Sequence, residues 1–169
     1  LPLGAMLEEA VLEVGPSDKK LHVSCMPSKS GAGPVPEVLR QPELIYGIGN
    51  LIANAAEFAA KNVWVIGRYS SEDVVIEIAD DGLGFQPDIL ARLGEPYNTT
   101  RARVGDEADD EGQTGMGLGY FIARTLLLRS GGRIEARNLA PDEIVGNSTP
   151  GGAYVAIHWP RARFDATSD

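Results

Sequence analysis

Cysteine is almost absent from this sequence, and long apolar runs are missing. Cys25 stands alone, so it cannot form an internal disulfide, and we interpret it as a packing residue. No stretch reaches the roughly 18–20 apolar residues that a membrane span requires, and no basic region followed by an apolar segment opens the chain. We therefore expect no membrane contact by this segment.

Positive charge is also scarce. The chain has 15 lysines and arginines against 24 aspartates and glutamates, which gives a formal net charge of −9. This balance repels nucleic acid, and no basic stripe offsets it, so we expect no nucleic acid partner. The chain does have 43% apolar residues in 169, enough for one core. Glycine, with 20 residues, exceeds its usual share of about 7%.

Hydrophobic spacing predicts the elements of the first half of the chain. Apolar residues at helical spacing indicate a short helix over Leu3–Leu12 and a longer one over Glu43–Ala60. Alternating or β-branched runs indicate strands over Leu21–Cys25, Val63–Ile66 and Val74–Ala79, the last two as an antiparallel pair.

The second half begins with a polar stretch, Gln86–Thr114, which we interpret as a mobile loop with a short helix near Ile89–Leu93. The glycines of residues 115–119 then open a helix that ends before Gly131. Arg133–Arg137 and Ala153–Trp159 are expected to form a final pair of strands.

Asn50, Asn54 and Glu57 share one face of the longer helix, with Phe58 beside them. Asparagine is a poor helix former, so two in mid-helix are costly unless they serve a purpose. One reading is a solvated face. The other is a neutral oxygen that binds a hard cation such as Mg²⁺, whose remaining ligands are phosphate and water.

Asp80 ends an apolar strand and is followed by Gly82 and Gly84. The glycines let the backbone turn sharply and leave room for a flat ligand, while the carboxylate can accept a hydrogen bond from an exocyclic amine. An ordinary Asp-Gly turn is the alternative.

Gly115, Gly117 and Gly119 open a helix, where free N–H groups and the helix dipole favour phosphate. The motif is not a P-loop, because the last lysine of the chain is Lys61, and its spacing does not match the dinucleotide fingerprint. Mg²⁺ and arginines such as Arg101 must then neutralise the phosphates. A flexible hinge before the helix remains the alternative.

The order of these three motifs resembles the catalytic ATP-binding domain of two-component sensor histidine kinases, in the superfamily that includes gyrase, Hsp90 and MutL. Residues 50–55 (NLIANA) are similar to its N box, 80–84 (DDGLG) to its G1 box and 115–119 (GMGLG) to its G2 box. The resemblance runs from about Leu21 to Trp159. Residues 47–51, 93–97, 99–101 and 115–122 are most similar to the redox-responsive RegB/PrrB subfamily.

The resemblance implies an α/β sandwich of the Bergerat type, with a mixed, mainly antiparallel sheet, helices on one face and a long ATP lid over Gln86–Thr114. It also implies a division of the chain into three parts. Residues 1–20 are expected to be a connecting helix from an absent dimerisation and phosphoacceptor domain, 21–160 the catalytic ATP-binding domain, and 161–169 a C-terminal tail.

The resemblance also assigns roles. Asn54 would bind Mg²⁺, Asn50 the phosphates or a metal-bound water, and Asp80 the adenine amine. Phe58 would pack on adenine. The remaining residues expected to bind ATP are Gly82, Gly84, Thr100, Arg101, Gly115, Gly117, Leu118 and Gly119. Glu57 departs from the pattern, because many histidine kinases have a basic residue there.

Asn50 stands where the ATPases of this superfamily have a glutamate that activates water. Without that base, the domain is expected to hold ATP and to transfer its γ-phosphoryl group to a positioned nucleophile. His22 and His158 are interpreted as structural, so the acceptor histidine is expected on the separate dimerisation domain and the fragment is not expected to autophosphorylate. The alternatives are an anti-sigma-type Ser kinase, a pseudokinase module or a non-enzymatic scaffold.

The resemblance implies two partners, which are the protein's own dimerisation domain and, through the whole kinase, a response regulator. We expect the isolated domain to be monomeric, because dimerisation belongs to the absent helical part. The expected location is the cytoplasmic side of an inner-membrane sensor kinase.

Overall fold

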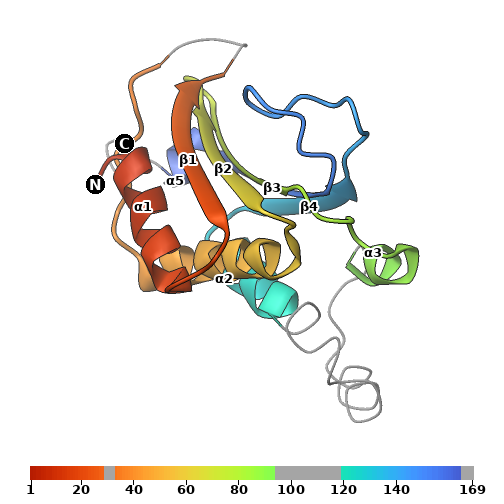
Figure 1. Cartoon of the computed structure of the whole chain (residues 1–169). Coiled ribbons are helices and arrows are strands. Elements are labelled where there is room, and N and C mark those ends of the chain that lie inside the picture. The colour runs from red at the N-terminus through yellow and green to blue at the C-terminus, as the bar shows by residue number, and fades with distance from the viewer. Residues whose placement is uncertain (29–32, 94–118, 165–169) are drawn as a thin grey trace.

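The fold is a five-stranded sheet with helices on one face, seen in a computed structural model that describes residues 1–28, 33–93 and 119–164 (Figure 1). The strands are β1 (Lys20–Pro27), β2 (Asn62–Tyr69), β3 (Asp73–Asp80), β4 (Arg133–Asn138) and β5 (Ala153–Pro160). The helices are α1 (Leu3–Val14), α2 (Pro42–Phe58), α3 (Pro87–Leu93) and α5 (Arg161–Phe164), and residues 119–129 are also helical.

The strand order is β1-β2-β3-β5-β4. β1 pairs with β2 in parallel, and the other three pairs are antiparallel. This arrangement confirms the mixed, mainly antiparallel sheet, the antiparallel pair of β2 and β3, and the pairing of β4 with β5 that the sequence predicts. The parallel pair requires a crossover, which α2 provides.

The core lies between the sheet and its helices. Within it, α1 buries Leu3, Met6, Leu7 and Ala10 completely. Two glycines of α2 allow close helix packing. A Cβ on Gly47 would come within 3.0 Å of the Leu127 side chain, and one on Gly49 would lie 3.2 Å from the Ala10 carbonyl oxygen. Helix α2 is therefore held between α1 and the helical residues 119–129.

Helix α2 has Pro42 in its first turn and ends at Phe58 rather than at the expected Ala60. It stops early because Ala59 has an extended backbone, with a ψ of 150°. Of the helices in the described ranges, none is long and apolar enough to cross a membrane.

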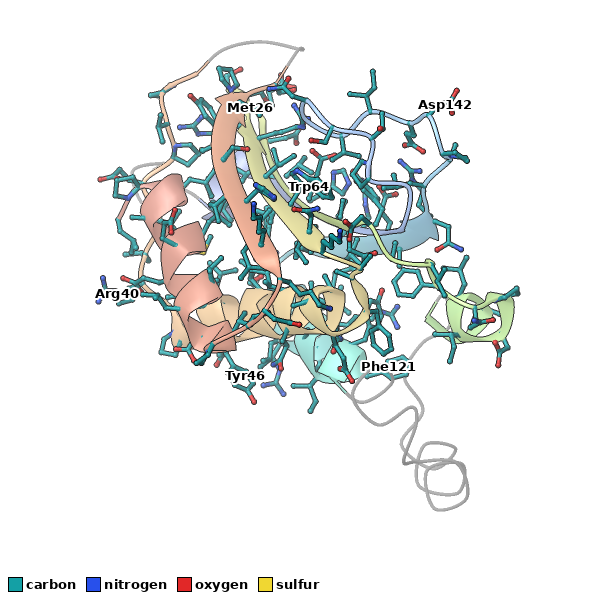
Figure 2. All side chains as sticks on the ribbon, viewed as in Figure 1. Met26, Arg40, Tyr46, Trp64, Phe121 and Asp142 are labelled. Atoms are coloured by element: carbon teal, nitrogen blue, oxygen red, sulfur yellow. The ribbon has the colours of Figure 1, made fainter. Side chains whose placement is uncertain are left out.

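The opposite face of the sheet carries a smaller apolar cluster under the connection between β4 and β5. Trp64 and Met26 pack against this cluster (Figure 2). Beside it, Glu77 accepts hydrogen bonds from Arg68 and from the Tyr154 hydroxyl, both at 2.5 Å. The hydrogen-bonding groups of these three side chains pair with one another. We therefore interpret this face of the sheet as structural.

Candidate functional site

The C-terminal half of α2 forms one wall of a pocket. Asn54 and Phe58 are one turn apart, so both side chains lie on the same side of the helix and line the pocket. Asn50 lies one turn earlier on the same face. In the described part of the chain, the amide nitrogens of Asn50 and Asn54 are buried and have no hydrogen-bond partner.

Asp80 lies at the end of β3 and is only 3% exposed. Its Oδ1 atom accepts hydrogen bonds from the backbone N–H groups of Gly82 at 2.9 Å and Ala153 at 3.2 Å. Burial raises the pKa of this carboxyl, although the two hydrogen bonds and the charge of Lys19 oppose the shift. Both hydrogen bonds involve Oδ1, so Oδ2 is the oxygen available to a ligand.

The turn after β3 is fixed by Asp81. Its Oδ1 atom accepts three backbone N–H groups, from Ala60 at 2.9 Å, Lys61 at 2.9 Å and Asn62 at 3.0 Å. Burial raises the pKa of Asp81, but these hydrogen bonds outweigh burial and leave the pKa below its usual value. The second aspartate of the motif therefore holds the turn in place and does not face the pocket.

Gly82 and Gly84 are required by space and by backbone conformation. A Cβ on Gly82 would lie 2.1 Å from the carbonyl oxygen of Phe58, so only glycine fits. Gly84 has a φ of +84°, and a Cβ there would lie 2.8 Å from Oδ1 of Asn138. Both glycines thus let the turn approach its neighbours closely.

The pocket opens to solvent and spans about 440 Å³ when the open space at its mouth is counted. Its walls are mostly apolar, and Asn54 and Asp80 are the polar groups that matter for recognition. Such a pocket suits a flat ring with a polar edge. The described lining residues are Leu51, Asn54, Ala55, Phe58, Ile78, Asp80, Gly84, Phe85, Tyr120, Ala153 and Val155.

Four of the site residues expected from the sequence, Asn54, Phe58, Asp80 and Gly84, therefore line one pocket. Gly119 lies next to them, since a Cβ there would be 3.3 Å from Oδ1 of Asn54. Asn50 and Gly82 lie beside the pocket but do not line it. The other expected residues fall outside the described ranges: Thr100, Arg101, Gly115, Gly117 and Leu118.

The sequence analysis did not identify several lining residues. Tyr120 directly follows Gly119, the last glycine of the third motif, and this position in the sequence could have indicated that it lies in the pocket. Ile78 and Val155 were recognisable only as strand residues, because β3 and β5 must pair before it is known which face they share. Phe85 could not be assigned to the pocket from the sequence, because its place depends on how the turn after Gly84 folds back.

The donor set fits Mg²⁺ at Asn54 but does not form a complete cage. No group of three or more histidine, cysteine or acidic side chains suited to a metal occurs in the described ranges. The amide nitrogen of Asn54 has no hydrogen-bond partner in the described ranges. Because the two ends of an amide are assigned from their hydrogen bonds, the oxygen can occupy that position and act as a single protein ligand. Mg²⁺ commonly takes one or two protein oxygens and completes its shell with phosphate and water.

Comparisons with known proteins agree with this geometry. The chain is 38% identical over 161 residues to the sensor histidine kinase RegB of Cereibacter sphaeroides, a match that covers 94% of this chain and 35% of that protein. The chain thus spans about a third of the length of this relative. Its fold is similar to that of a mycobacterial sensor histidine kinase, MprB, with a TM-score of 0.63, 18% identity and 95% and 96% of the two chains covered.

The catalytic domain of the histidine kinase ThkA has the same fold, with a TM-score of 0.59, 14% identity and 95% and 94% of the two chains covered. The family model of histidine kinase-, DNA gyrase B- and HSP90-like ATPases matches residues 40–163, which contain α2, the pocket and both strands that frame it. With that match over most of its length, the chain belongs to the family of histidine kinase-, DNA gyrase B- and HSP90-like ATPases.

Proposed function

We propose that this chain is the catalytic ATP-binding domain of a sensor histidine kinase, which binds Mg-ATP and donates the γ-phosphoryl group to a histidine on a separate dimerisation domain. The buried Asp80 carboxylate, which lines one apolar pocket together with Asn54, is the observation that carries the proposal. Asp80 accepts a hydrogen bond from the adenine amine through Oδ2. Phe58 and the apolar walls pack on the ring.

Asn54 holds Mg²⁺, which supplies positive charge to the phosphates, and Asn50 contacts the phosphates from the preceding turn of α2. Asp80 is the one carboxylate among the described lining residues, and its hydrogen bonds with Gly82 and Ala153 fix it at the end of β3. No described acidic side chain of the lining is therefore placed to activate water at the phosphate end. Bound ATP is kept intact for a better-positioned nucleophile.

The acceptor histidine comes from outside this chain. His22 stacks on Trp64 with a centroid distance of 5.4 Å, and its Nε2 lies 2.9 Å from Oδ1 of Asn62. His158 pairs weakly with Glu135 at 3.5 Å. Both histidines lie on the face of the sheet opposite the pocket, so neither can reach bound ATP. A dimerisation domain in the same protein, on the cytoplasmic side of the membrane, supplies the acceptor, and a response regulator receives the phosphoryl group.

Labelled ATP tests the proposal. The isolated chain is expected to bind ATP in the presence of Mg²⁺ by calorimetry and to acquire no stable label. The full-length protein is expected to acquire acid-labile label on a histidine outside this chain. Stable label on His22 or His158, or acid-stable label on a serine, would overturn the histidine kinase assignment.

A further inference from the structure

Lys19 reaches across the fold to the end of α2. It lies in the connection between α1 and β1, and its Nζ atom donates hydrogen bonds to the carbonyl oxygens of Ala56 at 2.9 Å and Ala59 at 2.6 Å. Helix α2 has no basic residue in its own last turn and no glycine at its C-terminal cap. Lys19 therefore satisfies carbonyl groups that the helix leaves without partners, and its charge complements the helix dipole.

The same turn is held from the opposite side by Asp81, which accepts the N–H groups of the next three residues, Ala60, Lys61 and Asn62. Lys19 thus holds carbonyl groups up to and including that of Ala59, and Asp81 holds the N–H groups that follow it. Phe58 lies inside this bracketed segment. Its ring lines the pocket, and its carbonyl oxygen packs against Gly82.

Phe58 is 42% exposed and is the last residue of α2, where helices fray. Its contribution to the pocket therefore depends on whether the last turn of α2 is formed. The groups that stabilise this turn lie far away in the sequence, since Lys19 is 37 and 40 residues from its two acceptors.

We propose that Lys19 is a positioning residue of the nucleotide pocket, which keeps the last turn of α2 formed so that Phe58 and the Gly82 turn meet the adenine ring. The proposal rests on the proposed function, because it concerns the same pocket. Lys19 does not touch the nucleotide.

The test compares Lys19→Met and Lys19→Arg with the wild-type chain by calorimetric titration with ATP and Mg²⁺. Lys19→Met is expected to weaken binding roughly three- to tenfold, because the binding-competent turn is then populated only part of the time. Lys19→Arg keeps a cationic donor and is expected to restore most of the affinity. Lys20→Met is the matched control, because the Lys20 side chain is adjacent in sequence and exposed, and its replacement changes the charge by the same amount.

A double-mutant cycle with Phe58→Ala separates positioning from general stability. If Lys19 acts through Phe58, Lys19→Met weakens binding much less in the Phe58→Ala background. Titrations are made well below the unfolding temperature of each variant, and Lys19→Gln replaces Lys19→Met if the latter does not fold.

Unchanged ATP affinity in Lys19→Met would overturn the proposal, as would an equal loss in Lys20→Met or an undiminished loss in the Phe58→Ala background. Failure of the wild-type chain to bind ATP would instead overturn the proposed function. The two failures are therefore distinguishable.

Discussion

The side chain of Asn138 pairs with the backbone of Phe85 as a neighbouring strand would. Its Oδ1 atom accepts the Phe85 N–H at 2.7 Å, and its Nδ2 atom donates to the Phe85 carbonyl at 3.0 Å. Asn138 ends β4, and Phe85 is a buried residue of the pocket wall. One side chain thus ties the turn that follows β3 to the edge of the sheet, and it sets the position of that wall.

Replacing Asn138 is expected to loosen the wall. Asn138→Ala removes both hydrogen bonds and should lower the free energy of unfolding by about 1–3 kcal/mol, measured by urea denaturation. ATP binding should weaken as well, because Phe85 is no longer held. Asn147→Ala, at an exposed asparagine of the nearby loop, serves as the control. Normal ATP affinity in a folded Asn138→Ala variant would show that the wall does not depend on this pairing.

Gly152 should tolerate no side chain. A Cβ there would lie 2.3 Å from Oδ1 and 2.5 Å from the carbonyl oxygen of Asp80, so Gly152→Ala must displace the carboxylate or the strand end. We expect loss of ATP binding and a clear fall in melting temperature. Gly4→Ala is the control. Gly4 lies in α1, where alanine is the better helix former, and a Cβ on it would meet only the Cβ of Cys25, at 4.0 Å. A Gly152→Ala variant with normal melting and binding would contradict the geometry.

Asp80→Asn should separate binding from stability. The pKa of Asp80 is raised on folding, so its ionised form costs stability as the pH rises from the ordinary value of 3.8 through the raised pKa. Asparagine keeps the Oδ1 acceptor without that cost. The free energy of unfolding of the Asp80→Asn variant at neutral pH should equal or exceed that of the wild type. Calorimetry should at the same time detect no ATP binding. Retained ATP binding would remove Asp80 from the adenine site.

ATP affinity should depend on pH through the same carboxyl. Because the pKa of Asp80 lies above its usual value, the carboxyl gains a proton at a higher pH than an ordinary aspartate. A protonated carboxyl is a weaker acceptor for the adenine amine, so affinity should fall as the pH falls through the raised pKa. Calorimetric titrations across the acidic range measure this fall. Asp80→Glu, which retains a carboxyl, should shift the midpoint, and a pH-independent affinity would exclude this role.

Asn54→Ala should affect only the metal-dependent part of binding. The Asn54 amide nitrogen has no partner in the described part of the chain, so its removal should change the free energy of unfolding by less than about 1 kcal/mol. ATP affinity should fall when Mg²⁺ is present and stay near the wild-type value in a chelator. An equal loss under both conditions would assign Asn54 to the nucleotide rather than to the metal.

The sequence predicted the helices and strands well because their apolar spacing is local. The resemblance of the three motifs to the histidine kinase domain also brought Asn54, Phe58 and Asp80 into one expected site. The sequence did not identify Lys19 or Asn138, because each acts on backbone groups 37 to 53 residues away and no local pattern marks such contacts. Nothing in the local sequence marks Gly152 as a site residue, since its contact with Asp80 exists only after β3 and β5 have paired.

The parallel pairing of β1 with β2 has a consequence for the order of folding. The hairpin of β2 and β3 closes a short turn, whereas β1 can meet β2 only after α2 has crossed between them, and distant closure is slow. We expect the hairpin to form early, and β1 and β5, whose partners are distant in sequence, to dock later. Because Lys19 directly precedes β1, the contact that secures Phe58 forms only in this later stage of folding.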